Sequence, residues 1–114
     1  MSPLDAEHAQ FLRELLLRQI LDDAEQWRQV GYDPSRFLGM VHNYGPVEAC
    51  SRVIMDPALP RDFLKLCQSD RLDLTVEALV LRDKFKILFA DNVLVQARKR
   101  LANCLQSAVP KAIH

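Results

Sequence analysis

The chain has 114 residues, a common size for a single domain, so it can bury one ordinary hydrophobic core without disulfides or metals. Hydrophobic residues make up 49% of the chain and charged residues 26%, a globular composition that excludes a disordered polar polymer. Fifteen basic residues balance fifteen acidic ones, so the net charge favours neither nucleic acid nor an anionic membrane as a partner.

The first predicted element is a long helix from about Asp5 to Gln29, within residues 1–30. It is rich in Leu, Ala, Glu, Gln and Arg, which are strong helix formers, and Gly31 ends it. With ~100° of rotation per residue, one wide apolar stripe runs along this helix and is expected to face the core. The stripe consists of Leu12, Leu16, Leu17, Ile20, Leu21, Ala24 and Trp27.

A second apolar group on the first helix lies largely outside that stripe. It consists of Leu4, Phe11 and Leu15. A helix at the edge of a small domain needs only one stripe, so something else must cover this group. The cover is either another helix of the same chain or a second copy of the protein, for which a two-fold dimer is the commonest closed arrangement. These three residues are therefore candidates for self-association.

Residues 31–54 predict two short helices joined by a glycine turn. Asp33 is a good N-cap, Pro34 suits the first helical position, and Gly45 separates the two helices. Such a pair is either a DNA-binding helix-turn-helix unit or a plain helical hairpin. A recognition helix offers polar and basic groups at its N-terminus, whereas this one begins with Pro-Val-Glu and has Arg52 as its only cation. We therefore favour a hairpin packed in the core.

The next stretch, "RDFLKLCQS", predicts a short fourth helix. Its inward residues are Phe63, Leu64 and Cys67. The stretch "RLDLTVEALVL" fits either a strand or a buried helix, and the helix is favoured because no second strand is predicted to pair with its backbone. Asp73 is the expected cap of that helix. A last helix begins at Asp91 and is expected to end at Pro110.

Together these elements predict an all-α fold. It is a compact bundle of five to six helices in which a long N-terminal helix precedes shorter ones. Residues 1–114 form one domain, with residues 31–108 as a helical module behind the first helix. The expected core consists of Trp27, Phe37, Leu38, Val76, Leu79, Phe85, Phe89 and Leu101.

Positive charge is concentrated in the second half of the chain. Residues 1–60 carry five basic and nine acidic side chains, whereas residues 61–114 carry ten and six. The halves either complement each other when they pack, or leave a basic C-terminal face for a phosphate backbone or an acidic partner. The sharpest basic cluster is expected to project outward from the last helix, as a solvated face or a partner-docking patch. It consists of Arg98, Lys99 and Arg100.

The three cysteines are widely spaced and form no C-x-x-C pair. They are Cys50, Cys67 and Cys104. No disulfide framework or zinc knuckle is therefore predicted, and reduced, mostly buried thiols fit a cytoplasmic protein. The N-terminus lacks the basic-then-apolar pattern of a signal peptide, and no apolar run approaches the ~20 residues of a membrane span.

Patterns for catalysis or cofactor binding are missing from the sequence. The three histidines lack metal-ligand spacing, no cysteine has an evident partner base, and the glycines form no phosphate-binding loop. The adjacent carboxylates of Asp22 and Asp23 are expected on a solvated face. We therefore expect a protein that works by binding, with no enzymatic activity, no metal and no cofactor.

Four blocks of the sequence resemble a known kind of module. They are "GYDPSRFLGMV", the glycine turn before "VEAC", "RLDLTVEALVL" and "LF…ARKRL", and they cover about residues 31–101. In this order they resemble a helical module found near the C-terminus of uncharacterised bacterial proteins, some of which carry nuclease or other defence-related domains. The resemblance implies a non-catalytic accessory domain and supplies no site residues. The chain departs from the pattern in having Gly45-Pro46 in place of two glycines, and a long first helix in place of a large partner domain.

The sequence thus favours a non-catalytic protein-interaction or regulatory module of a bacterial or mobile-element protein, with phage or plasmid defence as its setting. The expected partner is another protein, and a homodimer through the first helix is one form that this binding takes. The alternative is a nucleic-acid-binding accessory protein that uses the basic C-terminal half.

Overall fold

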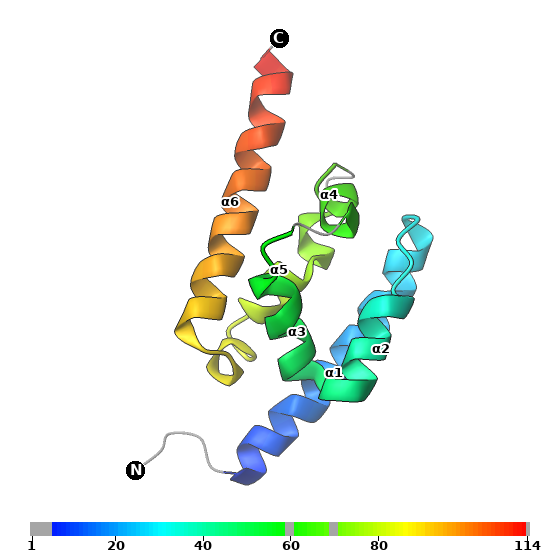
Figure 1. The fold of residues 1–114 in the computed structure, drawn as a ribbon, viewed down its shortest axis with the longest axis vertical. Helices are drawn as coiled ribbons and strands as arrows, with labels where there is room; N and C mark the ends of the chain where they lie inside the picture. The colour runs from blue at the N-terminus through cyan, green and yellow to red at the C-terminus, as the bar shows by residue number, and fades with distance from the viewer. Residues whose placement is uncertain (1–5, 59–60, 69–70, 114) are drawn as a thin grey trace.

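The computed structural model describes residues 6–58, 61–68 and 71–113, with the backbone alone at residues 61, 62, 65 and 105–113. Within these ranges the chain forms six α-helices, two short 3₁₀ helices and no strand (Figure 1). The elements are α1 (Ala6–Gln29), α2 (Ser35–Tyr44), α3 (Pro46–Met55), α4 (Arg61–Gln68), η1 (Leu72–Leu74), α5 (Val76–Val80), η2 (Lys86–Leu88) and α6 (Asp91–Ile113). The predicted all-α bundle with a long first helix is confirmed.

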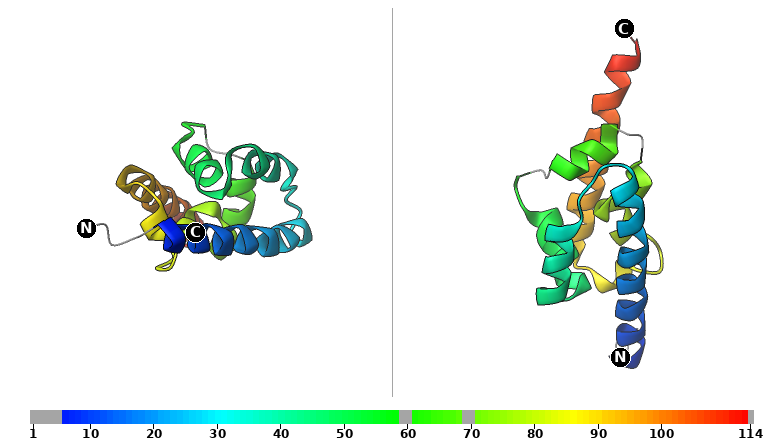
Figure 2. Two further views of the ribbon diagram at one scale, coloured as in Figure 1. Left: turned by 90° about the horizontal axis from the view of Figure 1, so that it is seen from below. Right: turned by 90° about the vertical axis from the view of Figure 1, so that its right-hand side faces the viewer.

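The two long helices, α1 and α6, extend beyond the other helices at opposite ends of the molecule (Figure 1). The molecule therefore measures 53 × 29 × 22 Å, and its Cα radius of gyration is 14.6 Å. A fully compact domain of this length has a radius of gyration of about 13 Å. A second view shows α1 along one edge, with the other α-helices on a single side of it (Figure 2, left). Helix α1 thus has a face toward the core and an outer face.

Trp27 connects α1 to the segments that follow. Its indole Nε1 donates a 2.7 Å hydrogen bond to the backbone carbonyl oxygen of Leu74. Its ring centroid lies 5.2 Å from that of Tyr32 and 5.8 Å from that of Phe37, the latter in an edge-on arrangement that aromatic pairs favour. The polar atom of this buried side chain is therefore satisfied, and its apolar surface joins α1 to α2 and η1.

Most of the predicted core is confirmed. Leu38 is partly buried and packs against the core, and Leu101 is half-buried. The other six expected residues are buried, namely Trp27, Phe37, Val76, Leu79, Phe85 and Phe89. These six come from four segments, namely α1, α2, α5 and the connector around η2, so the core unites the first helix with the rest of the chain.

Helices α2 and α3 follow one another around Gly45 and pack against each other, as the two predicted short helices should. The Asp33 carboxylate accepts a 3.0 Å hydrogen bond from the backbone N–H of Ser35. The N-cap position of α2 is nevertheless Pro34, with no side-chain cap bond, so the prediction of Asp33 as N-cap and Pro34 as first helical residue is wrong by one position. Gly45 has a φ of 85°, which a residue with a Cβ rarely adopts, and its N–H donates to the carbonyl of Val41 at 2.8 Å. Its own carbonyl accepts from the N–H of Ala49, so one glycine ends α2 and begins α3.

The segment "RLDLTVEALVL", which fitted either a strand or a helix, is helical as predicted, but a different residue from the expected one caps its helix. The hydroxyl of Thr75 accepts a 3.0 Å hydrogen bond from the N–H of Ala78 and so caps α5. Asp73 was the expected cap, and this expectation is wrong because a short 3₁₀ turn precedes α5. Within that turn the Asp73 carboxylate instead pairs with the guanidinium of Arg71 at 3.2 Å.

The apolar stripe of α1 is narrower than predicted. Leu17 and Leu21 were assigned to the buried stripe, but they are 36% and 52% exposed. Asp23 takes part in the buried face instead, although it was expected on a solvated one. A polar residue can lie on the inward row of a helix when the fold brings partners to it, and a pattern of apolar residues alone does not reveal this.

Two details of the later helices also differ from the sequence prediction. Leu64 was expected to face inward but is exposed, and Leu66, two residues on, is buried in its place. Helix α6 runs through Pro110 to Ile113 rather than ending at Pro110. A proline removes a single backbone N–H, and a helix can continue past it at a cost in free energy.

Cys67 and Cys104 form a disulfide that joins α4 to α6, with 6.1 Å between their Cα atoms. That separation lies in the ordinary range for disulfides. The prediction of reduced thiols is therefore wrong for these two residues, while Cys50 is free and buried as expected. Sequence spacing could not indicate the pairing, because the two cysteines are 37 residues apart and only the packing of α4 on α6 brings them together.

Candidate functional site

The basic cluster of α6 is not one exposed patch. Arg98 and Lys99 are exposed as predicted, but Arg100 is only 5% exposed. The prediction that Arg100 projects outward is therefore wrong. Arg100 follows Ala97 by three residues and precedes Cys104 by four, and both of these residues are buried. Helical geometry places all three on the inward row of α6.

The Arg100 guanidinium joins three helices. Its Nη1 lies 3.0 Å from Oε2 of Glu77 in α5 and also donates a 2.9 Å hydrogen bond to the carbonyl of Val53 in α3. Its Nη2 donates to the carbonyl of Asp56, immediately after α3. These carbonyls belong to the C-terminal end of a helix, where backbone acceptors lack helical partners. Arg100 therefore supplies hydrogen-bond donors to the free carbonyl groups at the end of α3, and its guanidinium is not available for docking.

Glu77 is the buried partner of this arginine and is 2% exposed. Burial raises the pKa of Glu77, and the hydrogen bond from Arg100 lowers it by less than burial raises it. A buried carboxylate with a single cation as its partner costs free energy if that cation is removed. The pair thus has a structural role, because its hydrogen bonds are all made within the chain.

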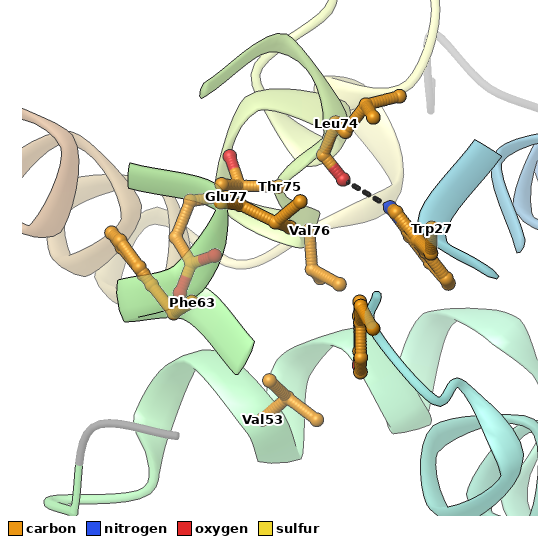
Figure 3. Close-up of a pocket in the computed structure, with 9 residues that line it drawn as sticks. Trp27, Val53, Phe63, Leu74, Thr75, Val76 and Glu77 are labelled. Carbon is orange, nitrogen blue, oxygen red and sulfur yellow. Dashed lines mark hydrogen bonds between the residues drawn. The ribbon is translucent and has the colours of Figure 1, made fainter. Parts of the chain in front are cut away.

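A cavity of about 30 Å³ lies beside Glu77 and Trp27 (Figure 3). It is lined by Trp27, Tyr32, Val53, Phe63, Leu66, Leu74, Thr75, Val76 and Glu77. A cavity of this size holds about one or two water molecules, whereas sites for metabolites span roughly 300–1,000 Å³. The indole N–H at its edge is already bonded to the carbonyl of Leu74. This cavity is therefore a packing feature and not a substrate pocket.

Asp23 is a second buried carboxylate, 2% exposed, on the inward face of α1. Its Oδ1 accepts a 3.0 Å hydrogen bond from the amide of Gln19, but its Oδ2 has no hydrogen-bond partner among the described residues. Burial raises the pKa of Asp23, while the Gln19 hydrogen bond and the positive charge of Arg82 oppose that rise. Sequence reasoning missed it, although its position three residues after the buried Ile20 and four before Trp27 is a usable signal.

The outer face of α1 carries a row of residues at alternating spacings of three and four. This outer row consists of Phe11, Glu14, Arg18, Leu21 and Glu25. Spacing of this kind keeps residues on one side of a helix, as along the seam of a coiled coil. At ~100° per residue the outer row lies about opposite the buried row that contains Leu16, Ile20 and Trp27. Phe11 is 56% exposed and Leu21 is 52% exposed.

The three residues predicted for self-association are placed differently from one another. Phe11 is exposed on the outer row. Leu15 is partly buried and packs against the core, so the chain itself covers most of it. Leu4 lies outside the described residues. The structure adds Leu21 as an exposed apolar side chain on the same side as Phe11, which the sequence had assigned to the core.

The charged members of the outer row are weakly engaged within the chain. Glu14 accepts a 3.2 Å hydrogen bond from Gln10, and Glu25 pairs with Arg28 at 3.1 Å with both side chains more than half exposed. Arg18 is exposed and makes no hydrogen bond or ion pair with any residue that the structure describes. Exposed pairs of this kind contribute about 0–1 kcal/mol, so these charges are free to meet a partner.

No other cluster of chemical groups stands out. In the described ranges no three His, Cys, Asp or Glu side chains are placed to hold a metal ion. The buried thiol of Cys50 has its pKa raised by desolvation, which makes it a poor nucleophile. Among the described helices none combines the length and apolar character that crossing a membrane requires. No family model, curated protein or solved structure matches the chain.

Proposed function

We propose that this chain is a small non-catalytic interaction module that binds another protein through the outer row of α1. The observation that carries the proposal is the exposure of Phe11 and Leu21, each more than half open to solvent, on the side of α1 opposite the core. The two side chains lie about 15 Å apart along α1, with the partly exposed Leu17 between them in sequence, and exposed apolar side chains along one helix face are a common feature of interfaces. The rest of the fold then has the role of holding α1 rigid through its buried row.

The setting that we propose follows from the sequence resemblance over residues 31–101. Modules of that kind accompany nuclease and other defence-related domains in bacterial proteins, so a defence-related assembly is the proposed context. The disulfide between Cys67 and Cys104 weighs against the cytoplasmic location that the sequence favours, because disulfides are rare in reducing compartments.

Nucleic acid binding is the less favoured alternative. It relied on the basic C-terminal half of the chain, whose sharpest basic cluster is Arg98, Lys99 and Arg100, and the burial of Arg100 leaves only Arg98 and Lys99 of this cluster exposed. Two cations release few counterions from a phosphate backbone, so they supply little of the electrostatic attraction that such binding needs. The outer row of α1 combines two exposed apolar side chains with two acidic residues and one basic residue, which suits a protein partner better than a phosphate backbone.

A differential capture experiment tests the proposal. Three immobilised proteins are compared in a bacterial lysate supplemented with the free chain, and retained proteins are identified by mass spectrometry. They are the wild type, an outer-row variant with Phe11→Glu and Leu21→Glu, and a matched control with Met55→Glu and Val95→Glu. Met55 and Val95 are 43% and 46% exposed on other helices.

The proposal predicts at least one protein, either a copy of the chain or a different one, that the wild type and the control retain and the outer-row variant loses. Circular dichroism should show all three folded, because the four substituted side chains are exposed. Identical sets of retained proteins on all three supports would refute the outer row as the binding surface.

A further inference from the structure

We propose that α4 is a redox-controlled lid over the cavity beside Trp27 and Glu77. The disulfide between Cys67 of α4 and Cys104 of α6 holds this lid closed, and reduction of the disulfide releases it. The cavity lies against the buried row of α1, on the side opposite the outer row, so this inference is independent of the proposed function. Reducing conditions thereby uncover an apolar surface that oxidising conditions keep covered.

Besides the disulfide, few contacts hold α4 to the rest of the fold. The helix packs against α6 and η1, and its buried side chains Phe63 and Leu66 are 6% and 3% exposed. Its next residues Leu64 and Gln68 are exposed. None of the side chains that the structure describes in α4 makes a hydrogen bond or an ion pair. A helix of eight residues is too short to be stable alone, so α4 depends on its packing and on the disulfide.

The packing under α4 is incomplete, because its two buried side chains border the cavity. Phe63 and Leu66 line one part of it, and Trp27, Val53 and Val76 are among the residues that line the rest. Phe63 and Trp27 lie on opposite sides of the residues drawn in Figure 3. Side chains that border a cavity lack partner atoms on that side and lose the dispersion attraction those atoms would give. Burial of Phe63 and Leu66 therefore stabilises the closed position less than a fully packed contact would.

The rest of the core does not depend on α4. Among the described residues, the connected hydrophobic core takes only Leu66 from this helix. The other members come from α1, α2, α3, α5 and α6 and from the segments around η1 and η2. Helix α3 packs directly against α1, α2, α5 and α6 without α4 between them. Release of α4 therefore leaves a connected core, so we expect a local opening and not the unfolding of the whole chain.

A dithiol supplies the two electrons that open the disulfide. Cys67 is partly buried whereas Cys104 is 7% exposed, so the dithiol reaches the sulfur of Cys67 more easily. Its thiolate forms a bond to that sulfur, and the Cys104 sulfur leaves as a thiolate. The second thiol of the reagent then displaces Cys67, so the reagent ends as a disulfide and its two protons end on the two cysteines. A small-molecule disulfide reverses this exchange and closes the lid.

Amide hydrogen exchange of the full chain, resolved by residue with NMR, tests the lid. It is measured in the oxidised chain, in the chain reduced by a dithiol without denaturant, and after reoxidation by a small-molecule disulfide. The amides of Leu66 and Cys67 report on α4, whereas those of Cys50 and Leu79 report on α3 and α5, where both side chains are fully buried. A variant with Cys67→Ser and Cys104→Ser is the matched control, since it cannot respond to the reagent.

In the reduced chain the α4 amides should be at least about hundredfold less protected than those of α3 and α5, as for a unit that opens by itself. Oxidation should restore their protection. The control variant should show the low protection of α4 with or without the dithiol. Acrylamide quenching of the fluorescence of Trp27, which borders the cavity, should increase on reduction of the wild type only.

Three results would overturn the lid. Unchanged protection of α4 on reduction would show that its packing alone holds it in place. Loss of protection at Cys50 and Leu79 together with α4 would show that the disulfide supports the whole fold and that no separate lid exists. Free thiols at Cys67 and Cys104 after oxidation would show that the latch does not form. None of these results bears on the outer row of α1, whose capture experiment stands by itself.

Discussion

Replacing Arg100 by methionine should destabilise the fold far more than the same change at its neighbour Arg98. The substitution keeps most of the apolar stem and removes the guanidinium. It leaves Glu77, 2% exposed, as a buried carboxylate without its cation. It also removes the donors to the carbonyls of Val53 and Asp56. Removing one partner of a buried ion pair costs about 3–5 kcal/mol, against a total stability of roughly 5–15 kcal/mol for a domain.

Urea denaturation followed by fluorescence measures this loss directly, because Trp27 is the only tryptophan of the chain and is fully buried. Arg98→Met serves as the matched control and should change the free energy of unfolding by no more than about 0.5 kcal/mol. Should Arg100→Met prevent folding, Arg100→Lys provides a milder test. A lysine cannot serve three acceptors at once, so it should lose about 1.5–3 kcal/mol, the value of a hydrogen bond to a charged group.

The pH dependence of the Arg100→Met variant gives a second readout. Burial already raises the pKa of Glu77, and loss of the cation should raise it further. A carboxyl whose pKa is higher in the folded state contributes stability at acid pH, and this contribution is lost as pH rises through the folded pKa. The deficit of the variant should therefore shrink as the pH is lowered from neutrality toward about 5. Equal losses for Arg98→Met and Arg100→Met would refute the buried role of Arg100.

Three other predictions concern the core. Burial raises the pKa of Asp23, so the contribution of this carboxyl to stability is greatest in acid and is lost as the pH rises. Urea denaturation at several pH values should therefore show the free energy of unfolding of Asp23→Asn increasing relative to that of the wild type between about pH 4 and neutrality. A constant difference between the two proteins would contradict this. Replacing Cys67 and Cys104 by serine removes a disulfide that spans 37 residues and should lower the free energy of unfolding by about 4 kcal/mol through loop entropy. A dithiol reductant should cause the same loss in the wild type. An unchanged urea midpoint would argue against the disulfide. Leu79→Ala should cost about 2–5 kcal/mol in urea denaturation, since that side chain is fully buried, and a loss below 1 kcal/mol would show that the site collapses or is open.

The helices themselves could be predicted from the sequence because local rules decide them. Gly45 marks the end of α2 by its positive φ, and Asp33 lies one residue before the N-cap Pro34, so both ends of α2 are indicated by residues within a few positions. The segment around Leu79 was assigned to a helix because no pairing strand existed, and tertiary contacts bury it as expected. Such features need no knowledge of the distant parts of the chain.

The role of individual polar residues was harder to predict. Arg100 follows the spacing of the inward row of α6, yet an arginine in a basic cluster is usually solvated, so its residue type outweighed its position. Its burial depends on Glu77 and on the end of α3, which are more than twenty residues away in the sequence. The Cys67–Cys104 pairing is hidden for the same reason. Leu21 shows the opposite error, since an apolar residue at helical spacing was assigned to the core and lies on the surface.

The claim that the outer row of α1 is an interface is tested most directly by the proteins that the chain retains from a lysate when this row is changed. The wild type and the control with Met55→Glu and Val95→Glu should both retain at least one protein that the variant with Phe11→Glu and Leu21→Glu loses, while all three keep the wild-type circular dichroism spectrum. An outer-row variant that retains the same proteins as the wild type would contradict the account.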